Sequence, residues 1–195
     1  MSAQARPNFS VDKVLDCKGL ACPMPVVRTK KAMEQIAPGQ VIEVQATDKG
    51  SLADMKGWAN NTGHHYLGSI QEGDVMRHFL RKASPQETKA ERKYPHTITN
   101  EELQARLQSP EPFLLIDVRE PAEYAFQRIP AAKSIPLGVL EQHLDELPTD
   151  RDMFVICRSG NRSDLACQLL AGKGFSRVKN VVPGMAGWGG PVESQ

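Results

Sequence analysis

Cysteines and long apolar runs are both scarce in this sequence. Its 195 residues include four cysteines, too few for a disulfide scaffold, so we expect free thiols in a reducing compartment. No stretch approaches the roughly 18 apolar residues that a membrane helix needs. The first residues also lack the apolar segment of a secretory signal. We therefore expect a cytoplasmic protein with no membrane association.

The chain also lacks a dominant charge. Its 24 Lys and Arg residues face 23 Asp and Glu residues, a net charge of +1, so no whole-chain attraction to nucleic acid or to a membrane surface follows. Residues 1–83 hold 11 basic and 8 acidic residues (+3), whereas residues 97–195 hold 10 and 13 (−3). Ordinary solvated surfaces explain this mild asymmetry, and weak docking of one half on the other is the alternative.

The apolar pattern divides the chain into two α/β halves. Residues 1–83 follow the order β-α-β-α-β-β, with strands expected over 11–16, 40–47, 64–71 and 75–82 and helices over 26–37 and 52–61. Residues 84–96 are polar, proline-bounded and without apolar period. They are interpreted as an interdomain linker, compatible with a surface helix over 86–93.

From residue 97 onward, strands alternate with helices. Asn100 is expected to cap a helix that ends at Leu107, and the later elements are strands over 113–118, 132–135, 153–157 and 178–182 and helices over 121–127, 137–147 and 162–171. Such alternation predicts a mostly parallel sheet covered by helices on both faces. Chemistry in these folds lies at the carboxyl ends of strands, where Asp117 and Cys157 stand.

One stretch of the second half concentrates reactive and charged residues. An apolar strand leads into a short polar loop and a helix start, with the sequence Cys157-Arg158-Ser159-Gly160-Asn161-Arg162-Ser163. The loop and the first helical turn offer backbone N–H groups to one spot, which stabilises an anion there. Because a cysteine stands at that spot, we expect Cys157 to act as a nucleophilic thiolate.

Two chemistries use a cysteine in such a loop. A cysteine-dependent phosphatase needs Cys-x5-Arg to wrap a tetrahedral phosphate, whereas Cys157 and Arg162 form Cys-x4-Arg, and Ile156 replaces the usual histidine. The smaller loop favours the terminal sulfur of a persulfide. A phosphatase or an arsenate reductase remains the disfavoured alternative.

Four motifs in the second half carry a family resemblance. They lie at residues 117–124 (Asp-Val-Arg-Glu-Pro-Ala-Glu-Tyr), 129–136, 157–163 and 180–188. With them, residues 97–192 resemble a single-domain rhodanese. Gln127-Arg128, where the family usually has Gly-His, and Pro183, where it commonly has glycine, depart from its pattern.

The resemblance to rhodanese implies the roles of several residues. Cys157 would carry the persulfide, while Asp117 and Arg119 would brace the loop or contact the substrate. The substrate would be bound by the remaining residues of the loop, which are Arg158, Ser159, Gly160, Asn161, Arg162 and Ser163.

A second cysteine motif lies in the first half. Cys22-Pro23-Met24-Pro25 places a thiol at a helix start, against the positive end of the helix dipole. Together with Asp16 and Gly19, it is similar to the Asp-x-x-Gly-x-x-Cys-Pro-x-Pro motif of the TusA/SirA-like sulfur-carrier family. That resemblance implies a β-α-β-α-β-β two-layer sandwich in which Cys22 carries sulfane sulfur between proteins.

Alternatives remain for the neighbours of Cys22. Cys17 is either a small filler at a strand end or a thiol that resolves a persulfide as a disulfide. A zinc site of Cys17, Cys22 and either His64 or His65 is compatible with the residue types. The wide Cys-x4-Cys spacing and the Pro23 helix entry disfavour it.

Together the two resemblances predict a sulfurtransferase with a built-in carrier: a carrier domain over 1–83, a linker over 84–96 and a rhodanese-like domain over 97–195. Sulfur on Cys157 would be relayed to or from Cys22. The expected donors are thiosulfate, a low-molecular-weight persulfide or relay proteins such as a cysteine desulfurase, without cofactor, metal or stable nucleic-acid binding. The alternative is a non-enzymatic sulfur-trafficking or redox-regulatory adaptor fed by partner proteins. Oligomeric state stays open.

Overall fold

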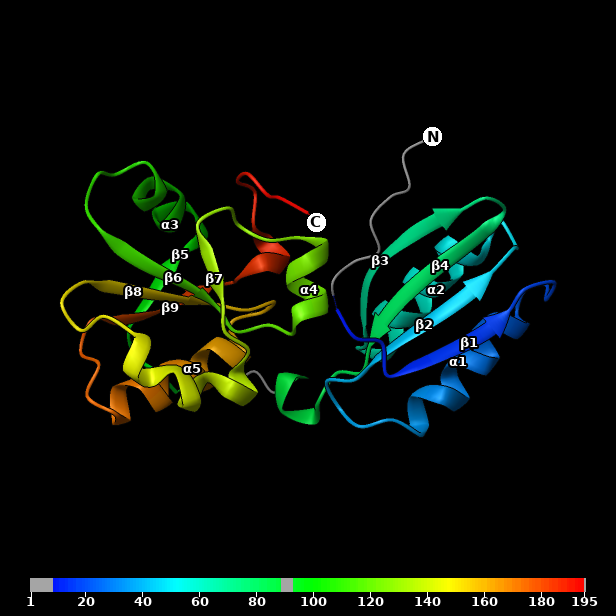
Figure 1. Ribbon diagram of the computed structural model, residues 1–195, viewed down its shortest axis with the longest axis horizontal. Coiled ribbons are helices and arrows are strands. Elements are labelled where there is room, and N and C mark those ends of the chain that lie inside the picture. Colours follow the sequence, from blue (N-terminus) through cyan, green and yellow to red (C-terminus); the bar gives the residue numbers. More distant parts are fainter. Residues whose placement is uncertain (1–8, 89–92, 195) are drawn as a thin grey trace. The chain divides into compact units, whose positions relative to one another are not determined.

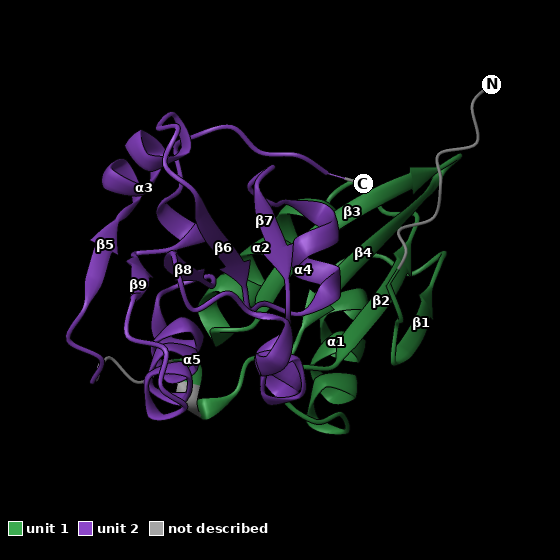
Figure 2. Cartoon of the chain, turned by 60° about the vertical axis from the view of Figure 1, so that its left-hand side comes forward, with its two compact units in different colours: residues 1–88 green, residues 89–195 purple. Residues whose placement is uncertain are grey.

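The chain folds as two units, each with its own sheet and hydrophobic core. The computed structural model describes residues 9–88 and 93–194. Unit 1 comprises residues 1–88 and unit 2 residues 89–195 (Figure 2). Among the described residues, no helix combines the length and the apolar composition that crossing a bilayer requires.

Unit 1 is a four-stranded sheet with two helices (Figure 1). The strand order is β1-β2-β4-β3, in which β1 runs parallel to β2 and the other neighbours are antiparallel. Its elements confirm the predicted β-α-β-α-β-β order: β1 (Lys13–Cys17), α1 (Met24–Glu34), β2 (Val41–Ala46), α2 (Ser51–Thr62), β3 (His65–Glu72), β4 (Val75–Arg81) and the 3-10 helix η1 (Pro85–Thr88).

A single core fills the space between this sheet and both helices. Met33 of α1 and Met55 of α2 meet Ile42, Val44 and other buried side chains of the strands. Because both helices share this core, they cover the same face of the sheet, which gives the two-layer sandwich expected from the sequence. Cys17 is also buried in the core, and burial raises the pKa of its thiol. Of the two alternatives for Cys17, this buried position at the end of β1 favours the small packing residue.

Unit 2 contains a five-stranded sheet in the order β5-β9-β8-β6-β7. Every strand pair is parallel, so the sheet is wholly rather than mostly parallel. Its elements are β5 (Thr97–Thr99), α3 (Asn100–Leu107), β6 (Phe113–Asp117), α4 (Pro121–Phe126), β7 (Ala132–Ser134), η2 (Leu137–Glu146), β8 (Asp152–Ile156), α5 (Asn161–Gly172), β9 (Val178–Val182) and η3 (Met185–Gly187).

Both faces of the unit 2 sheet are covered, as the apolar strands predict. Alternate residues of the central strand β8 enter different cores. Phe154 and Ile156 pack in the cluster that includes Leu103 of α3, whereas Met153 and Val155 pack with α5 and η2. A strand buried on both faces is the reason for its uninterrupted apolar sequence.

The start of α3 differs from the sequence prediction. Its N-cap is Thr99, whose hydroxyl accepts the Glu102 N–H while the Glu102 carboxylate accepts the Thr99 N–H. Asn100 is the first helical residue, and its side chain donates to the Gly184 carbonyl at 2.9 Å. The reciprocal capping pair satisfies two backbone donors, so the prediction was wrong by one residue.

The segment 84–96 makes contacts within each unit. In η1, the Glu87 carboxylate accepts two hydrogen bonds of 2.8 Å from Arg81 of β4. In unit 2, the Tyr94 hydroxyl donates to the Val178 carbonyl. The compatible helix over 86–93 falls partly on residues 89–92, which lie outside the described residues.

Candidate functional site

Cys157 lies between the central strand β8 and helix α5. The strand ends at Ile156, paired with Asp117 of β6, so the two predicted residues come to the same carboxyl edge of the sheet. Gly160 is the N-cap of α5 with φ of +86°. This left-handed conformation favours glycine, and it turns the chain so that the helix begins at Asn161, four residues after the cysteine.

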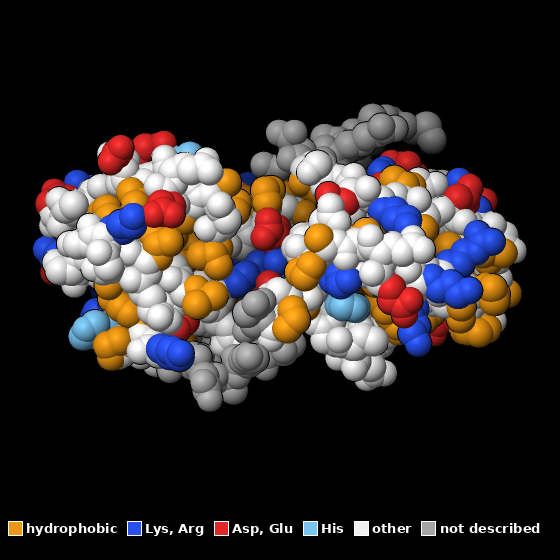
Figure 3. Space-filling view, turned by 90° about the horizontal axis from the view of Figure 1, so that it is seen from below, with side chains coloured by type: hydrophobic (Ala, Val, Ile, Leu, Met, Phe, Trp, Pro, Cys, Tyr) orange, Lys and Arg blue, Asp and Glu red, His pale blue; other side chains and the backbone are white. Residues whose placement is uncertain are grey.

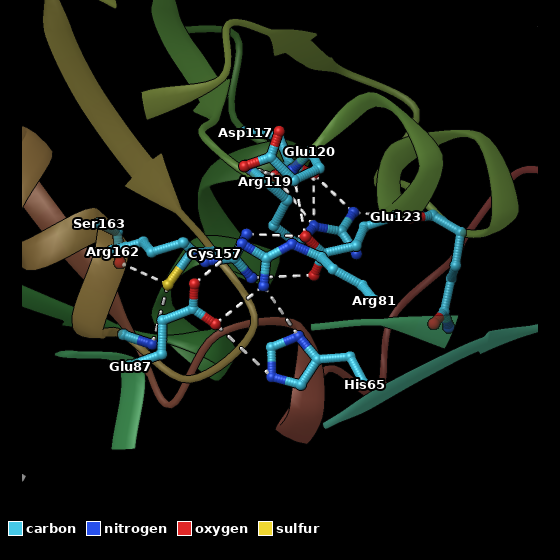
Figure 4. Close-up of polar contacts among 12 residues, drawn as sticks. His65, Arg81, Glu87, Asp117, Arg119, Glu120, Glu123, Cys157, Arg162 and Ser163 are labelled. Atoms are coloured by element: carbon cyan, nitrogen blue, oxygen red, sulfur yellow. Dashed lines mark hydrogen bonds and ion pairs between the residues drawn. The ribbon is translucent and has the colours of Figure 1, made fainter. Parts of the chain in front are cut away.

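Two polar groups lie within hydrogen-bond distance of the Cys157 sulfur (Figure 4). The Gly160 N–H donates to Sγ at 3.2 Å, and the Ser163 hydroxyl lies at 3.2 Å from the same atom. The 12-residue helix α5 starts beside them, which adds the positive end of its dipole. These groups stabilise negative charge on sulfur, as expected for the loop.

Asn180 on β9 holds this arrangement in place. Its Oδ1 accepts a 2.6 Å hydrogen bond from Ser163, and its Nδ2 donates to the Gly160 carbonyl at 2.9 Å. Since a hydroxyl has one proton, Ser163 donates either to Asn180 or to the sulfur. In the sequence, Asn180 is singled out only as part of the motif at residues 180–188. The available signal was an asparagine among the valines of strand β9.

The charge of Arg162 is paired with a carboxylate of a neighbouring helix. Its guanidinium makes a bidentate ion pair with Glu123 of α4, with N–O distances of 2.7 and 2.8 Å, and both side chains are buried. A buried guanidinium needs such a counterion. Arg162 therefore anchors the start of α5 to α4, whereas the resemblance to rhodanese implied a role in substrate binding.

Asp117 and Arg119 form a second buried pair. Arg119 Nη2 lies 2.6 Å from Asp117 Oδ2 and also donates to the Gln127 carbonyl. These contacts hold the turn after β6 to the end of α4. Of the two roles considered for Asp117 and Arg119, these contacts favour bracing of the loop over contact with the substrate. Of the other loop residues, Arg158, Ser159 and Asn161 are half-buried.

The segment after β9 closes against the Cys157 loop. The Met185 N–H donates to the Cys157 carbonyl and the Ala186 N–H to the Arg158 carbonyl, both at 2.8 Å. Gly184 has φ of +87°, and a Cβ there would lie 2.4 Å from the Cys157 carbonyl oxygen. A side chain is therefore excluded at Gly184. The residue before it is Pro183, which stands where the rhodanese family commonly has glycine.

Cys22 has a different electrostatic environment. It is exposed and precedes Pro23, the N-cap of α1. A hydrogen bond to Asp54, slight desolvation and the charges of Asp54 and Asp48 raise the pKa of its thiol. The expected activation by the helix terminus is therefore outweighed, because a carboxylate within hydrogen-bond reach opposes the thiolate. Nothing in the linear pattern signalled Asp54.

The turn that carries Asp48 is fixed by a buried hydrogen-bond chain. The Ser51 hydroxyl donates to the Asp48 carbonyl at 2.6 Å and lies 3.0 Å from His78 Nε2. Its single proton is thus used, so Nε2 carries a hydrogen and donates to Ser51. Nδ1 of His78 then accepts from the Tyr66 hydroxyl at 2.9 Å. His78 is fully buried as a neutral imidazole.

The stability of unit 1 is expected to fall in mild acid because of His78. Burial, with the charge of Lys56, lowers its pKa from 6.5 to about 4. An unfolded chain binds a proton there before the folded chain does, so this stabilisation is complete above pH 6.5 and is lost as the pH falls to 4. The full shift corresponds to about 3 kcal/mol.

Urea unfolding at several pH values checks this expectation. The chain has two tryptophans, so a Trp188→Phe background leaves Trp58 as the fluorescent reporter of unit 1. In the same background, His78→Gln should flatten the pH dependence. If the free energy of unfolding changed equally with pH in the chains with and without His78, the acid sensitivity could not be assigned to His78.

The fourth free thiol belongs to Cys167 on α5. Cys167 is buried, and burial raises the pKa of its thiol, as expected for a small core residue. Within residues 9–88 and 93–194, no group of three or more His, Cys, Asp or Glu is placed to hold a metal ion.

Comparisons with known proteins match the two units separately. The family model "Sulfurtransferase TusA" matches residues 13–82, and the model "Rhodanese-like domain" matches residues 99–190. These matches confirm both resemblances seen in the sequence. The fold and the two cysteine sites thus define the sulfur carrier and sulfurtransferase class.

Similar proteins span one or both units. "Putative sulfur carrier protein YrkF" of Bacillus subtilis is 46% identical over 180 residues, covering 92% of this chain and 97% of its own length. The chain therefore belongs to the family that joins a TusA-type sulfur carrier to a rhodanese-like domain. "Sulfur carrier protein TusA" of Allochromatium vinosum is 44% identical over 73 residues, covering 37% of this chain and 95% of its own. A rhodanese-like domain protein from Staphylococcus aureus is 31% identical, with a TM-score of 0.49, covering 51% and 98%.

Proposed function

We propose that this chain takes sulfane sulfur as a persulfide on Cys157 and exchanges it with Cys22. The observations that carry the proposal are the Gly160 N–H, which donates to the Cys157 sulfur, and the start of helix α5 beside it. They stabilise the thiolate that attacks a donor and the anionic persulfide that results. The presence of a sulfur-carrier domain and a rhodanese-like domain in one chain supports a relay between their two thiols.

Each transfer conserves atoms and electrons. The thiolate of Cys157 attacks the outer sulfur of the donor, a new S–S bond forms, and the donor's S–S bond breaks with its electron pair on the leaving group. In the exchange, the Cys22 sulfur attacks the outer sulfur of the Cys157 persulfide. Cys157 leaves as a thiolate, and the proton released from Cys22 returns to solvent or to Cys157. No oxidant is consumed.

The donors are proposed to be thiosulfate, a low-molecular-weight persulfide or a relay protein such as a cysteine desulfurase. A protein partner is supported by the surface of α1 next to Cys22, where Met24 and Val27 are exposed apolar residues beside Arg28 and Lys30. Figure 3 shows hydrophobic and basic side chains adjoining on the surface of unit 1. The four free thiols support a reducing, cytoplasmic setting.

Sulfur labelling tests the relay. A donor labelled in its sulfane sulfur is added briefly to the full chain, the thiols are alkylated, and the persulfide-bearing peptides are identified by mass spectrometry. We expect label first at Cys157 and then at Cys22, with a Cys22→Ser variant retaining label at Cys157. The buried Cys167 is an internal control that should stay unlabelled. The absence of label at Cys22 under every donor would disprove the relay.

A further inference from the structure

The Ser163 hydroxyl lies between two atoms that can both accept its proton. Its oxygen is 3.2 Å from the Cys157 sulfur, the contact drawn in Figure 4, and 2.6 Å from Oδ1 of Asn180. All three side chains are fully buried. Because a hydroxyl has one proton, it donates to one of the two atoms at a time. The charge on the sulfur therefore decides which atom receives the hydrogen bond.

The orientation of the Asn180 amide is fixed by its other contact. Its Nδ2 lies 2.9 Å from the carbonyl oxygen of Gly160, an atom that can only accept a hydrogen bond. The amide nitrogen must therefore face Gly160, and the amide oxygen faces Ser163. Asn180 itself lies inside the sheet, paired with Val155 on one side and with Thr97 on the other. The acceptor for the Ser163 proton is thus built into the site.

An empty Cys157 makes two different demands on this hydroxyl. When the sulfur is a neutral thiol, its S–H donates to Ser163 and Ser163 donates to Asn180, so each of the three groups has a partner. When the sulfur is a thiolate, it becomes an acceptor and the hydroxyl turns toward it. The buried oxygen of Asn180 then loses its donor. A buried acceptor without a hydrogen bond costs free energy, so Asn180 opposes the empty thiolate.

Loading with sulfur removes this competition. In a persulfide the negative charge lies on the outer sulfur, one S–S bond of about 2 Å beyond the cysteine sulfur. The inner sulfur is then neutral and a weak acceptor, like the sulfur of methionine. The Ser163 hydroxyl consequently donates to Asn180, whose oxygen is 2.6 Å away. The loaded site keeps the hydrogen bond that the empty thiolate breaks.

We propose that Asn180 is a positioning residue that withdraws the Ser163 proton from the empty Cys157 thiolate and so favours the uptake of sulfur. This inference rests on the proposed persulfide on Cys157 and adds the reason why the empty site is reactive. The Gly160 N–H and the start of α5 hold negative charge at the loop. The Ser163 proton distinguishes an empty sulfur from a loaded one.

The step conserves atoms and electrons. The Cys157 thiolate attacks the outer sulfur of the donor, a new S–S bond forms, and the donor's S–S bond breaks with its electron pair on the leaving group. The proton of the original thiol has gone to solvent before the attack. The O–H bond of Ser163 is not broken. It rotates from the sulfur to the Asn180 oxygen as the charge moves to the outer sulfur.

The equilibrium loading of Cys157 tests the proposal. The full chain carries Cys22→Ser, so that sulfur stays on Cys157, and mass spectrometry measures the ratio of loaded to empty chain. The chain is equilibrated with a fixed mixture of cysteine persulfide and cysteine at about pH 9, above the pH at which a free cysteine ionises. Asn180→Val removes the amide and suits a strand. It should lower the ratio about fivefold, which corresponds to one hydrogen bond.

A double-mutant cycle separates the proton from the packing. Asn180→Val also removes the amide contact with Gly160, and that loss is the same with or without a hydroxyl at position 163. In a Ser163→Ala background, the effect of Asn180→Val should therefore shrink to less than about twofold. Lys179→Gln changes the exposed residue before Asn180 on β9 and should leave the ratio unchanged.

A second measurement does not involve sulfur transfer. The ultraviolet absorbance of the Cys157 thiolate is obtained as the difference between each chain and its Cys157→Ser counterpart, at a pH where the thiol is partly ionised. Asn180→Val should increase the thiolate fraction, because Ser163 then donates to the sulfur without competition. In the Ser163→Ala background the fraction should not change. Circular dichroism checks folding, and Asn180→Ala replaces the valine variant in both assays if that variant does not fold.

The outcomes separate this inference from the proposed function. Sulfur on Cys157 with an unchanged ratio in Asn180→Val would overturn the inference and leave the persulfide on Cys157 intact. An equal change with and without the Ser163 hydroxyl would assign the effect to packing and also overturn it. A thiolate fraction that falls in Asn180→Val would contradict the competition for the proton. No sulfur on Cys157 in any variant would disprove the proposed function, and the inference with it.

Discussion

Replacing Glu123 with alanine is expected to destabilise unit 2 by about 3–5 kcal/mol, the usual penalty for leaving a buried charge without its partner. Glu123 makes both N–O contacts of the pair with Arg162, at 2.7 and 2.8 Å, and its carboxylate also accepts the Glu120 N–H. The guanidinium of Arg162 stays charged at any accessible pH. The loss of Glu123 therefore releases the start of α5, which carries the donors to the Cys157 sulfur.

Denaturant unfolding monitored by tryptophan fluorescence measures this effect. A Trp58→Phe background leaves Trp188, the second of the two tryptophans, as the reporter of unit 2. The exposed ion pair of Arg106 and Glu111 supplies the control, because Glu111→Ala should cost less than about 1 kcal/mol. A Glu123→Ala effect as small as that of Glu111→Ala would show that the buried pair contributes little to stability.

Replacing Cys157 with serine is expected to reduce sulfur transfer from thiosulfate to cyanide by at least about a thousandfold. In the proposed reaction, the Cys157 thiolate takes the outer sulfur of thiosulfate and releases sulfite, and cyanide then removes the sulfur as thiocyanate. A serine hydroxyl at this position cannot form the persulfide. The measurement is the rate of thiocyanate formation with the full chain.

Cys167→Ala is the matched control for that experiment. Cys167 is a buried core thiol on α5, so the variant should keep its turnover provided that it folds, which circular dichroism checks. Turnover retained by Cys157→Ser would contradict the assignment of the nucleophile. If the unaltered chain had no turnover but took sulfur from a protein donor, the adaptor alternative would replace the enzyme.

The local sequence carried most of the information about the fold. Apolar periodicity predicted the strands, and the uninterrupted apolar run of β8 indicated burial on both faces. The structure confirms this, because Phe154 and Val155 pack in different cores. The Cys157 loop was recognisable for the same reason, since strand, loop, glycine and helix start are contiguous. Its orientation at the strand's carboxyl edge followed from topology.

Contacts between distant segments could not be inferred in this way. The partnership of Arg162 with Glu123 spans 39 residues, and that of Ser163 with Asn180 spans 17. Asp54, which raises the pKa of the Cys22 thiol, likewise belongs to a separate segment, helix α2. These partners change the interpretation of residues that the sequence had already singled out: Arg162 anchors α5 to α4, and the pKa of the Cys22 thiol is raised rather than lowered.

The hydrogen bonds from Met185 and Ala186 to the Cys157 loop also bear on the order of events during synthesis. The ribosome completes Cys157 well before Met185 and Ala186, whose N–H groups donate to the carbonyls of Cys157 and Arg158. The nascent chain thus contains the nucleophile before it contains the segment that closes against its loop. The Cys157 loop gains these two backbone hydrogen bonds only after the chain has been extended past Ala186.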